Sequence, residues 1–253
     1  MIIGNAISFD RRLTWPGSRA SKGFDMLTST VAILHDNAAH GEDNYMVRSL
    51  DDDTTLDAIM DGVTGRGGRQ ASQEVVDALS DVPLTSPNDI VAILEEINQR
   101  FYQVSLGRFL LTTASVALCL GDHLHVVSAG DSPVWLIRSD TVQLLSSDTR
   151  GFVHAGITRA LGMQKTLRQL HRAKVTLVPG DRLVLASDGV TDNVTLDELV
   201  DMVRGATSPD EASERIQTLI ALRQAKGVLP EELGSRFRHD DQTAILRFFD
   251  AVT

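Results

Sequence analysis

The sequence predicts an α+β fold in which antiparallel β-sheets are covered by pairs of helices. Short, β-branched, strand-like runs dominate the front and the middle of the chain, and helical patterns follow one another in pairs. A chain of 253 residues can bury a core of its own, and no linker, internal repeat or low-complexity segment interrupts it. We therefore expect one domain over residues 29–253, preceded by an extension of unknown role at residues 1–28.

The first half of the chain is expected to hold strands and then two helices. Apolar residues at helical spacing predict both helices, and Ser86-Pro87-Asn88 is a start signal for the second. A turn of three aspartates separates the second and third strands. The expected strands are 29–34, 45–47 and 56–60, and the expected helices are 70–79 and 88–104.

From Thr112 onward the residue pattern becomes that of strands, and two further helices precede the last strand. Turn signals such as Gly121-Asp122 and Pro179-Gly180-Asp181 separate the strands. The expected strands are 115–120, 123–128, 133–138, 142–145, 173–177, 182–186 and 243–249, with helices at 196–204 and 209–226.

The charge balance excludes several classes of protein. Lys and Arg number 24 against 34 Asp and Glu, a net charge of −10, which is unsuited to nucleic-acid binding because phosphate contacts would be repulsive. No run of 18 apolar residues predicts a membrane span, and the first residues do not resemble a signal peptide. We expect a cytoplasmic protein with neither nucleic acid nor membrane as a partner.

The single cysteine, Cys119, excludes an intramolecular disulfide and a cysteine-based zinc site. It lies in an apolar strand and is expected to belong to the core. The seven histidines have no paired metal-ligand spacing.

Acidic residues gather where the expected strands begin or end. If these strand ends meet at one rim of a sheet, their mutual repulsion would raise their pKa values unless divalent cations neutralised them. Oxygen-only ligands favour Mg²⁺ or Mn²⁺. The acids concerned are Glu42, Asp43, Asp61, Asp131, Asp188, Asp192, Asp240 and Asp241.

Taken singly, these acids also have simpler interpretations. An aspartate before glycine, as at Asp61-Gly62 and Asp188-Gly189, is commonly part of a turn, and Asp181 is expected in a hairpin turn. The glycine-rich segment 61–68 lacks both GxxxxGK[ST] and GxGxxG, so it does not indicate a nucleotide-binding loop.

Eight short motifs in a fixed order favour a functional interpretation. They are Glu42-Asp43-Asn44, Asp61-Gly62-Val63-Thr64-Gly65, Leu111-Thr112-Thr113-Ala114, Ala129-Gly130-Asp131-Ser132, Ile157-Thr158-Arg159-Ala160-Leu161-Gly162, Pro179-Gly180-Asp181-Arg182-Leu183, Ser187-Asp188-Gly189-Val190-Thr191-Asp192 and Asp240-Asp241-Gln242-Thr243. The ordered set resembles the metal-dependent serine/threonine protein phosphatases of type 2C (PPM) in their compact bacterial form, over roughly residues 29–249.

The resemblance implies a four-layer α-β-β-α sandwich, with two central antiparallel sheets flanked by helix pairs. Residues 29–253 would be one phosphatase-like catalytic domain. It would hydrolyse phosphoserine or phosphothreonine in proteins, by attack of a water held between two metal ions. The substrate would be a phosphoprotein of a serine/threonine kinase pathway.

The resemblance also implies a role for each matching residue. Asp61 would bridge two Mn²⁺ or Mg²⁺ ions, and the Gly62 carbonyl would bind the second of them. Asp188 and Asp240 would hold the first ion, whereas Glu42 and Asp43 would orient metal-bound waters. Asp131 and Asp192 match the positions for a third, looser ion. Of these residues, Asp61, Asp43 and Asp188 would be catalytic.

Several positions depart from the family pattern. The usual Arg that clamps the substrate phosphate is replaced by Ala38, and Gly41 replaces the Asn three residues later. Either another cation such as Arg48, Arg66 or Arg69 substitutes for it, or phosphate binding is weak, because a bidentate Arg is hard to replace. Thr64 and Leu111 stand where glycine is usual, and the flap segment before Ile157 is almost missing.

These departures leave two alternatives to a phosphoprotein phosphatase. One is a regulatory binding module that keeps the phosphatase-like fold with weak or no turnover. The other is a nonspecific hydrolase of small phosphoesters.

Overall fold

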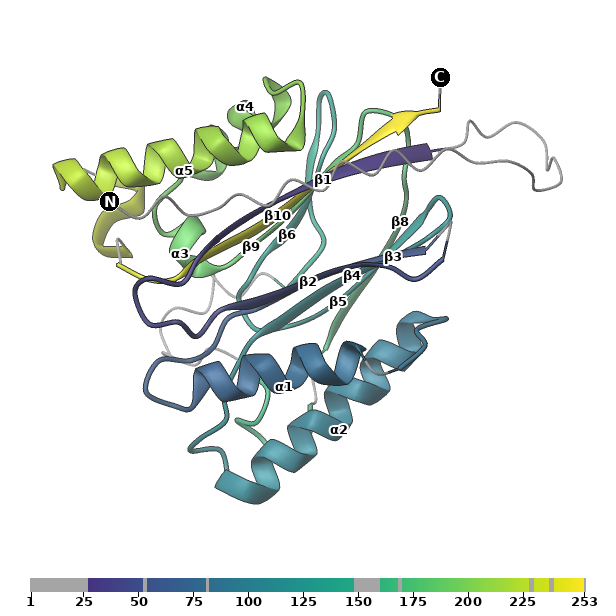
Figure 1. Cartoon of the computed structure of the whole chain (residues 1–253), viewed down its shortest axis with the longest axis vertical. Coiled ribbons are helices and arrows are strands. Elements are labelled where there is room, and N and C mark those ends of the chain that lie inside the picture. Colours follow the sequence, from purple (N-terminus) through teal and green to yellow (C-terminus); the bar gives the residue numbers. More distant parts are fainter. Residues whose placement is uncertain are drawn as a thin grey trace, which may run out of the picture.

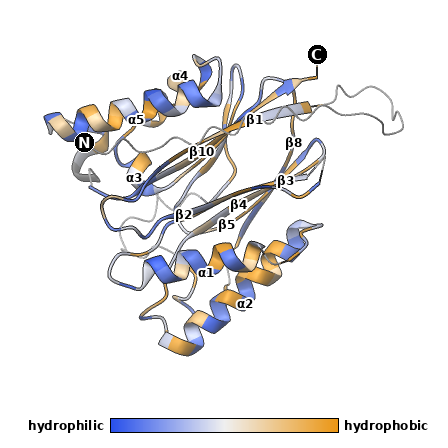
Figure 2. Ribbon diagram, viewed as in Figure 1, coloured by the Kyte–Doolittle hydropathy of each residue, from blue (hydrophilic) through white to orange (hydrophobic). Residues whose placement is uncertain are grey.

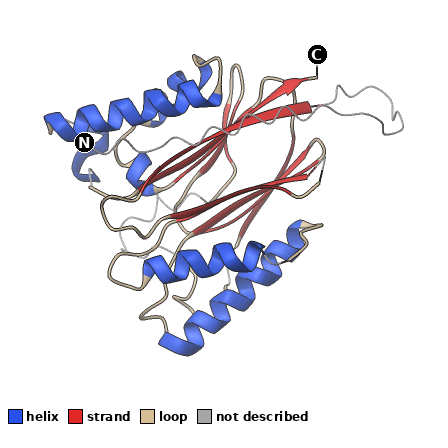
Figure 3. Cartoon of the chain, in the orientation of Figure 1, coloured by secondary structure: helices blue, strands red, loops and turns tan. Residues whose placement is uncertain are grey.

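The computed structural model describes residues 27–51, 54–80, 82–147, 160–167, 170–227, 230–236 and 239–252. Two five-stranded antiparallel sheets lie face to face between two layers of helices, which confirms the predicted sandwich (Figures 1 and 3). The first sheet has the order β1-β10-β9-β6-β7 and the second β2-β3-β4-β5-β8.

All the predicted strands and helices are present in the predicted order, and two short helices, Asp188–Thr191 and Glu231–Arg236, are additional. The strands of the first sheet are β1 Leu27–Asp36, β10 Gln242–Ala251, β9 Arg182–Ala186, β6 Val134–Ile137 and β7 Val142–Leu144. Those of the second are β2 Asn44–Ser49, β3 Thr54–Met60, β4 Ala114–Leu120, β5 His123–Ala129 and β8 His171–Thr176. The helices are α1 Gly68–Ser80, α2 Pro87–Ser105, α3 Asp188–Thr191, α4 Leu196–Arg204, α5 Pro209–Lys226 and the 3₁₀ helix η2 Glu231–Arg236.

Alternation along the strands creates three apolar layers. In β3, Leu56, Ala58 and Met60 face α1 and α2, whereas Ile59 faces the other sheet. The opposite outer layer packs the first sheet against α4 and α5. Hydrophilic and hydrophobic residues both occur along α1, α2 and α5, as expected for helices with one buried face (Figure 2). Cys119 is buried between the sheets, and burial raises the pKa of its thiol to about 12, which confirms a core role.

The long pairing of β1 with β10 joins the two ends of the described chain. It runs from Leu27 opposite Ala251 to Asp36 opposite Gln242. The strand β1 therefore begins two residues before the predicted domain boundary. Residues 1–26, most of the predicted extension, lie outside the described residues, as do Ile157, Thr158, Arg159 and the short flap segment before them.

Two further sequence-based expectations can be compared with the fold. Among the described residues, no helix combines the length and the apolar character needed to cross a membrane. Asp181 does lie in the predicted turn, but its side chain is buried and forms an ion pair with Arg138 at 2.8 Å, which a simple hairpin turn does not predict.

Candidate metal centre

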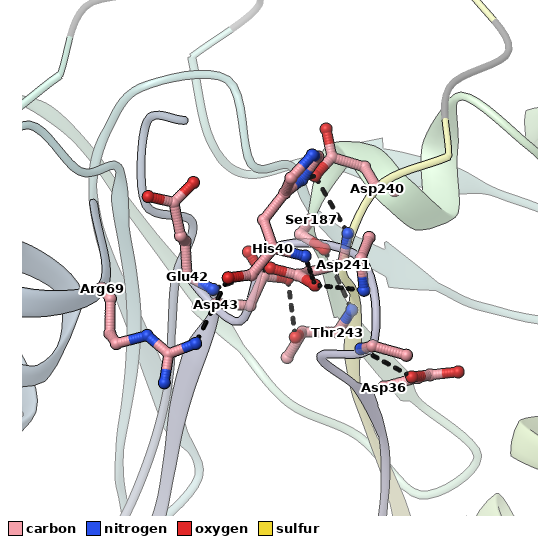
Figure 4. Close-up of polar contacts among 12 residues, drawn as sticks. Asp36, His40, Glu42, Asp43, Arg69, Ser187, Asp240, Asp241 and Thr243 are labelled. Carbon is pink, nitrogen blue, oxygen red and sulfur yellow. Dashed lines mark hydrogen bonds and ion pairs between the residues drawn. The ribbon is translucent and has the colours of Figure 1, made fainter. Parts of the chain in front are cut away.

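Four loops bring the predicted acids together at one rim of the sandwich. The β1–β2 loop carries Glu42 and Asp43, and Asp61 follows β3. Asp188 begins α3 directly after β9, and Asp240 precedes β10. Figure 4 shows Asp43 beside the first residues of β10, with Asp240 just before that strand and Glu42 on the opposite side, toward Arg69.

The charges of these acids act on one another. Burial raises the pKa of Asp61 well above its ordinary value, and the charges of Asp188, Asp43, Asp131 and Asp240 raise it further. The pKa of Asp43 rises to about 8, chiefly through burial, although hydrogen bonds from Thr243 and Ser187 oppose the rise. Asp131 therefore joins the cluster from the β5–β6 turn. Carboxylates that repel one another in this way form a site for cations.

The backbone around Asp61 is held by the Thr-Thr motif. The Asp61 carbonyl accepts hydrogen bonds from the Thr113 N–H at 2.8 Å and the Thr112 hydroxyl at 2.9 Å. The Asp61 N–H donates to Thr113 Oγ1 at 3.0 Å. The same Thr113 Oγ1 lies 2.8 Å from the hydroxyl oxygen of Ser132. Both threonines therefore hold the Asp61 backbone, and Thr113 also bonds Ser132, the neighbour of Asp131.

Position 62 is a glycine because backbone atoms of Glu42 and Gly68 approach it closely. A Cβ atom at this position would lie 2.5 Å from the Glu42 carbonyl oxygen and 2.5 Å from the carbonyl carbon of Gly68. Both contacts are closer than any side chain permits. This close approach holds the loop of Asp61 against the loop of Glu42 and against the first residue of α1.

Asp241 organises the loop that carries Glu42, a role that its sequence motif did not indicate. Its Oδ1 accepts from the N–H groups of Ala39 and His40 at 3.1 and 2.8 Å, and its Oδ2 accepts from the Glu42 N–H at 2.7 Å (Figure 4). The only signal in the sequence is its place beside Asp240.

His40 is a residue of the site that sequence reasoning missed. Its Nδ1 lies 2.9 Å from Asp240 Oδ1, and this hydrogen bond is the largest cause that raises the pKa of the imidazole. Ligand atoms of His40, Asp240 and Asp241 lie within 4.8 Å of one another, so this group could hold a cation. A lone histidine 200 residues away from its partner has no local signature.

The residues present fit a centre of hard divalent cations. The donors are carboxylate oxygens, which Mg²⁺ and Mn²⁺ prefer. Glu42 Oε2 is buried and has no hydrogen-bond partner within the described part of the chain. A buried oxygen without a partner destabilises the folded protein unless a ligand or a water molecule bonds to it. Asp192 lies at the end of α3, where its N–H donates to the Asp188 carbonyl at 2.7 Å.

Comparison with known proteins identifies the family. The model described as "Stage II sporulation protein E (SpoIIE)" matches residues 48–247. The chain belongs to the SpoIIE family of PP2C-type domains. This membership confirms the resemblance that the ordered motifs carry.

Curated relatives of this SpoIIE-family chain include proteins named as protein phosphatases. "Probable protein phosphatase 2C 45" of Oryza sativa subsp. japonica is 28% identical over 213 residues, which cover 69% of this chain and 75% of that protein. Protein phosphatase PhpP of Streptococcus pneumoniae is 28% identical over 205 residues, covering 69% of this chain and 82% of that one.

Solved structures share the fold. The catalytic domain of the serine/threonine protein phosphatase PstP, solved with two manganese ions, has a TM-score of 0.69 at 23% identity and covers 88% of this chain and 99% of that one. Phosphatase Stp1 of Staphylococcus aureus has a TM-score of 0.70 at 20% identity and covers 94% and 100%.

Proposed function

We propose that this protein is a metal-dependent phosphatase that hydrolyses phosphoserine or phosphothreonine in phosphoproteins. The observation that carries the proposal is the convergence of five acids at one rim, Asp43, Asp61, Asp131, Asp188 and Asp240. Burial, and then the charges of the other four, raise the pKa of Asp61 there. The family and its curated phosphatase relatives support the same reaction.

The acids would divide into three groups by their match to the family motifs. Asp61 would be shared by two ions, with the Gly62 carbonyl on the second ion and with Asp188 and Asp240 on the first. Glu42 and Asp43 would orient water, and Asp131 and Asp192 would hold a third, looser ion. We propose Mn²⁺ or Mg²⁺ for these sites, because the ligand atoms are oxygens.

Bound divalent ions would lower the pKa of a water and neutralise charge on the phosphoryl oxygens. The chain's own residues hold the reacting groups in place. Thr112 and Thr113 fix the backbone of Asp61, and Thr243 donates to Asp43 Oδ2 at 2.7 Å. Ser187 hydrogen-bonds the same carboxyl group, so two hydroxyl side chains hold Asp43 in the place where it would orient a water. Asp188 occupies the first position of α3, two residues after the end of β9.

Neither the site nor the comparisons favour the alternative of a regulatory binding module. A module without turnover would not need this set of partly buried, mutually repelling acids, which lower the stability of the fold when no cation is bound. The kinase pathway that supplies the phosphoprotein and a cytoplasmic location stay predictions from the sequence.

The test is hydrolysis of a phosphothreonine peptide by the purified protein, with Mn²⁺ titrated against EDTA. We expect turnover that needs the metal and that Asp61→Asn abolishes. A matched control is Asp210→Asn, an acid in the first turn of α5 outside the acidic cluster. Absence of turnover at millimolar Mn²⁺ in a folded protein would contradict the proposal. Equal rates on p-nitrophenyl phosphate and on the peptide would instead indicate a small-phosphoester hydrolase.

A further inference from the structure

We propose that Arg69, on the first turn of α1, binds the phosphoryl group of the substrate, and that position 41 is a glycine in order to admit its guanidinium. This inference rests on the proposed phosphatase function. It assigns the cation that the departures at Ala38 and Gly41 leave open.

Of the three arginines considered from the sequence, two are engaged elsewhere. Arg48 Nη1 donates to the carbonyl of Leu79 at 2.7 Å, at the far end of α1 from Arg69. Arg66 Nη1 lies 3.4 Å from the carbonyl of Arg108, beyond the end of α2. Arg69 alone among these three reaches the loop of Glu42, where its Nη2 donates to the His40 carbonyl at 3.3 Å (Figure 4).

Gly41 leaves the space that this guanidinium occupies. A Cβ atom at Gly41 would lie 2.0 Å from Arg69 Nη2 and 3.0 Å from Cζ. Any side chain at position 41 would therefore displace the guanidinium. Gly41 also has φ of +72°, a conformation that glycine adopts without strain. The departures at Ala38 and Gly41 are therefore linked. The arginine usual at position 38 is missing, and the absence of a side chain at position 41 lets Arg69 approach the site from α1.

The helix that carries Arg69 is anchored to the metal centre by the next residue on the same face. Ser72 follows Arg69 by three residues, and its hydroxyl donates to the Glu42 carbonyl at 2.6 Å. Asn44 Nδ2 in turn donates to Ser72 Oγ at 2.9 Å. These bonds hold the start of α1 at a fixed place beside Glu42, so the side chain of Arg69 starts from a rigid backbone.

The chemistry of Arg69 suits a phosphoryl group. A guanidinium presents five N–H donors in one plane and binds phosphate oxygens in pairs. Arg69 is exposed, and the bond to His40 uses one of its Nη2 donors. A phosphate dianion that approaches a rim of carboxylates is repelled unless a cation stands beside it. Arg69 supplies that charge at the edge of the cluster, next to Glu42 (Figure 4).

The first experiment compares Arg69→Ala and Arg69→Lys with the unchanged protein, using Mn²⁺-loaded protein. We expect Arg69→Ala to raise the KM for a phosphothreonine peptide and the Kd for inorganic phosphate, measured by calorimetry, by about 10- to 100-fold. Lysine should recover part of the loss, since it keeps the charge without the paired geometry. Arg66→Ala is the matched control and should leave both constants unchanged.

The second experiment tests the space at position 41. Gly41→Asn should displace the guanidinium and weaken phosphate binding to a similar degree, and adding Arg69→Ala should then cost little more, because both changes remove one contact. Thermal unfolding of each variant checks that it is folded.

The outcomes separate this inference from the proposed function. Metal-dependent turnover with unchanged phosphate affinity in Arg69→Ala would overturn the role of Arg69 and leave the phosphatase function standing. Absence of turnover in the unchanged protein would overturn the function, while the calorimetric comparison would still decide whether Arg69 binds phosphate. Phosphate that does not bind the unchanged protein at all would overturn the inference.

Discussion

At the scale of single residues, the contact between His40 and Asp240 shows that a residue outside the acidic cluster orients one of its carboxylates. The imidazole Nδ1 lies 2.9 Å from Asp240 Oδ1, and the backbone of His40 is held in turn by Asp241. A partner of this kind restricts the rotation of a ligating carboxylate. His40 is thus a positioning residue for one of the proposed ligands.

We predict that His40→Ala weakens Mn²⁺ binding by about 10-fold or more, because Asp240 loses the group that orients it. Calorimetric titration of Mn²⁺ into the protein measures the change. His40→Asn, whose side-chain amide can donate from nearly the position of Nδ1, should recover most of the affinity. Equal Mn²⁺ affinity in His40→Ala and the unchanged protein would contradict a positioning role.

At the scale of elements, a buried ion pair ties the two sheets together. Arg247 of β10 binds Asp57 of β3 through two hydrogen bonds, at 2.6 and 2.7 Å, and also donates to Ser29 of β1 at 2.9 Å. Burial lowers the pKa of the Arg247 guanidinium, but the charge of Asp57 outweighs burial and raises it overall. The Arg247 guanidinium therefore stays charged between the two sheets.

We predict that Arg247→Met lowers the free energy of unfolding by about 3–5 kcal/mol, because it leaves the Asp57 carboxylate buried without a partner. Urea denaturation measures the change. Combining it with Asp57→Leu should recover much of the loss, since no buried charge then remains. Arg215→Met, which breaks an exposed pair with Glu211 on α5, is the control and should cost at most about 1 kcal/mol.

The junction of α4 and α5 makes a pH-dependent contribution. Burial raises the pKa of Glu198, but hydrogen bonds from Arg223 and Thr195 outweigh burial and hold it below its ordinary value of 4.5. A carboxyl whose pKa is lower in the folded state stabilises the fold above the unfolded pKa, and this contribution is lost as pH falls.

We predict that Glu198→Gln lowers the free energy of unfolding near pH 7 by on the order of 1 kcal/mol, since the side chain is about a third exposed. The difference between the two proteins should shrink as pH falls below about 4.5. Denaturant unfolding at several pH values measures it. A difference that grows with acidity would show that the sign is wrong.

At the scale of the whole molecule, the acidic rim joins loops from both sheets. Asp43 precedes β2 of one sheet, and Asp188 and Asp240 flank β9 and β10 of the other. Their repulsion opposes closure of this edge of the sandwich, so a cation bound there should stabilise the entire fold.

We predict that Mn²⁺ raises the melting temperature, by an amount that corresponds to about 2.7 kcal/mol when free Mn²⁺ is 100 times its Kd. Excess EDTA should reverse the shift, and Asp61→Asn should nearly abolish it. Scanning calorimetry measures the change. A melting temperature that does not respond to Mn²⁺, in a protein whose turnover requires Mn²⁺, would contradict this link between the centre and the fold.

The fold and most of the acids of the centre could be predicted from the sequence, because both leave local signs. Strand and helix periods depend on neighbours two to four residues apart, and acids at strand ends are visible as soon as the strands are. The ordered motifs then predict which acids lie close together. The structure agrees for Asp43, Asp131, Asp188 and Asp240, because the charges of all four act on Asp61.

Other features depended on contacts between distant parts of the chain. The pairing of β1 with β10 brings Asp241 under the loop of Glu42 and brings His40 to Asp240. The choice of Arg69 among three arginines likewise depends on where the start of α1 meets Gly41. The sequence by itself determined the strands, the helices and the acidic positions, since these follow from local periods and motif order, and the family resemblance of the motifs implied the four layers. Only the tertiary structure decided which hydrogen bonds and which cation surround the centre, since those depend on the relative placement of loops far apart in the chain.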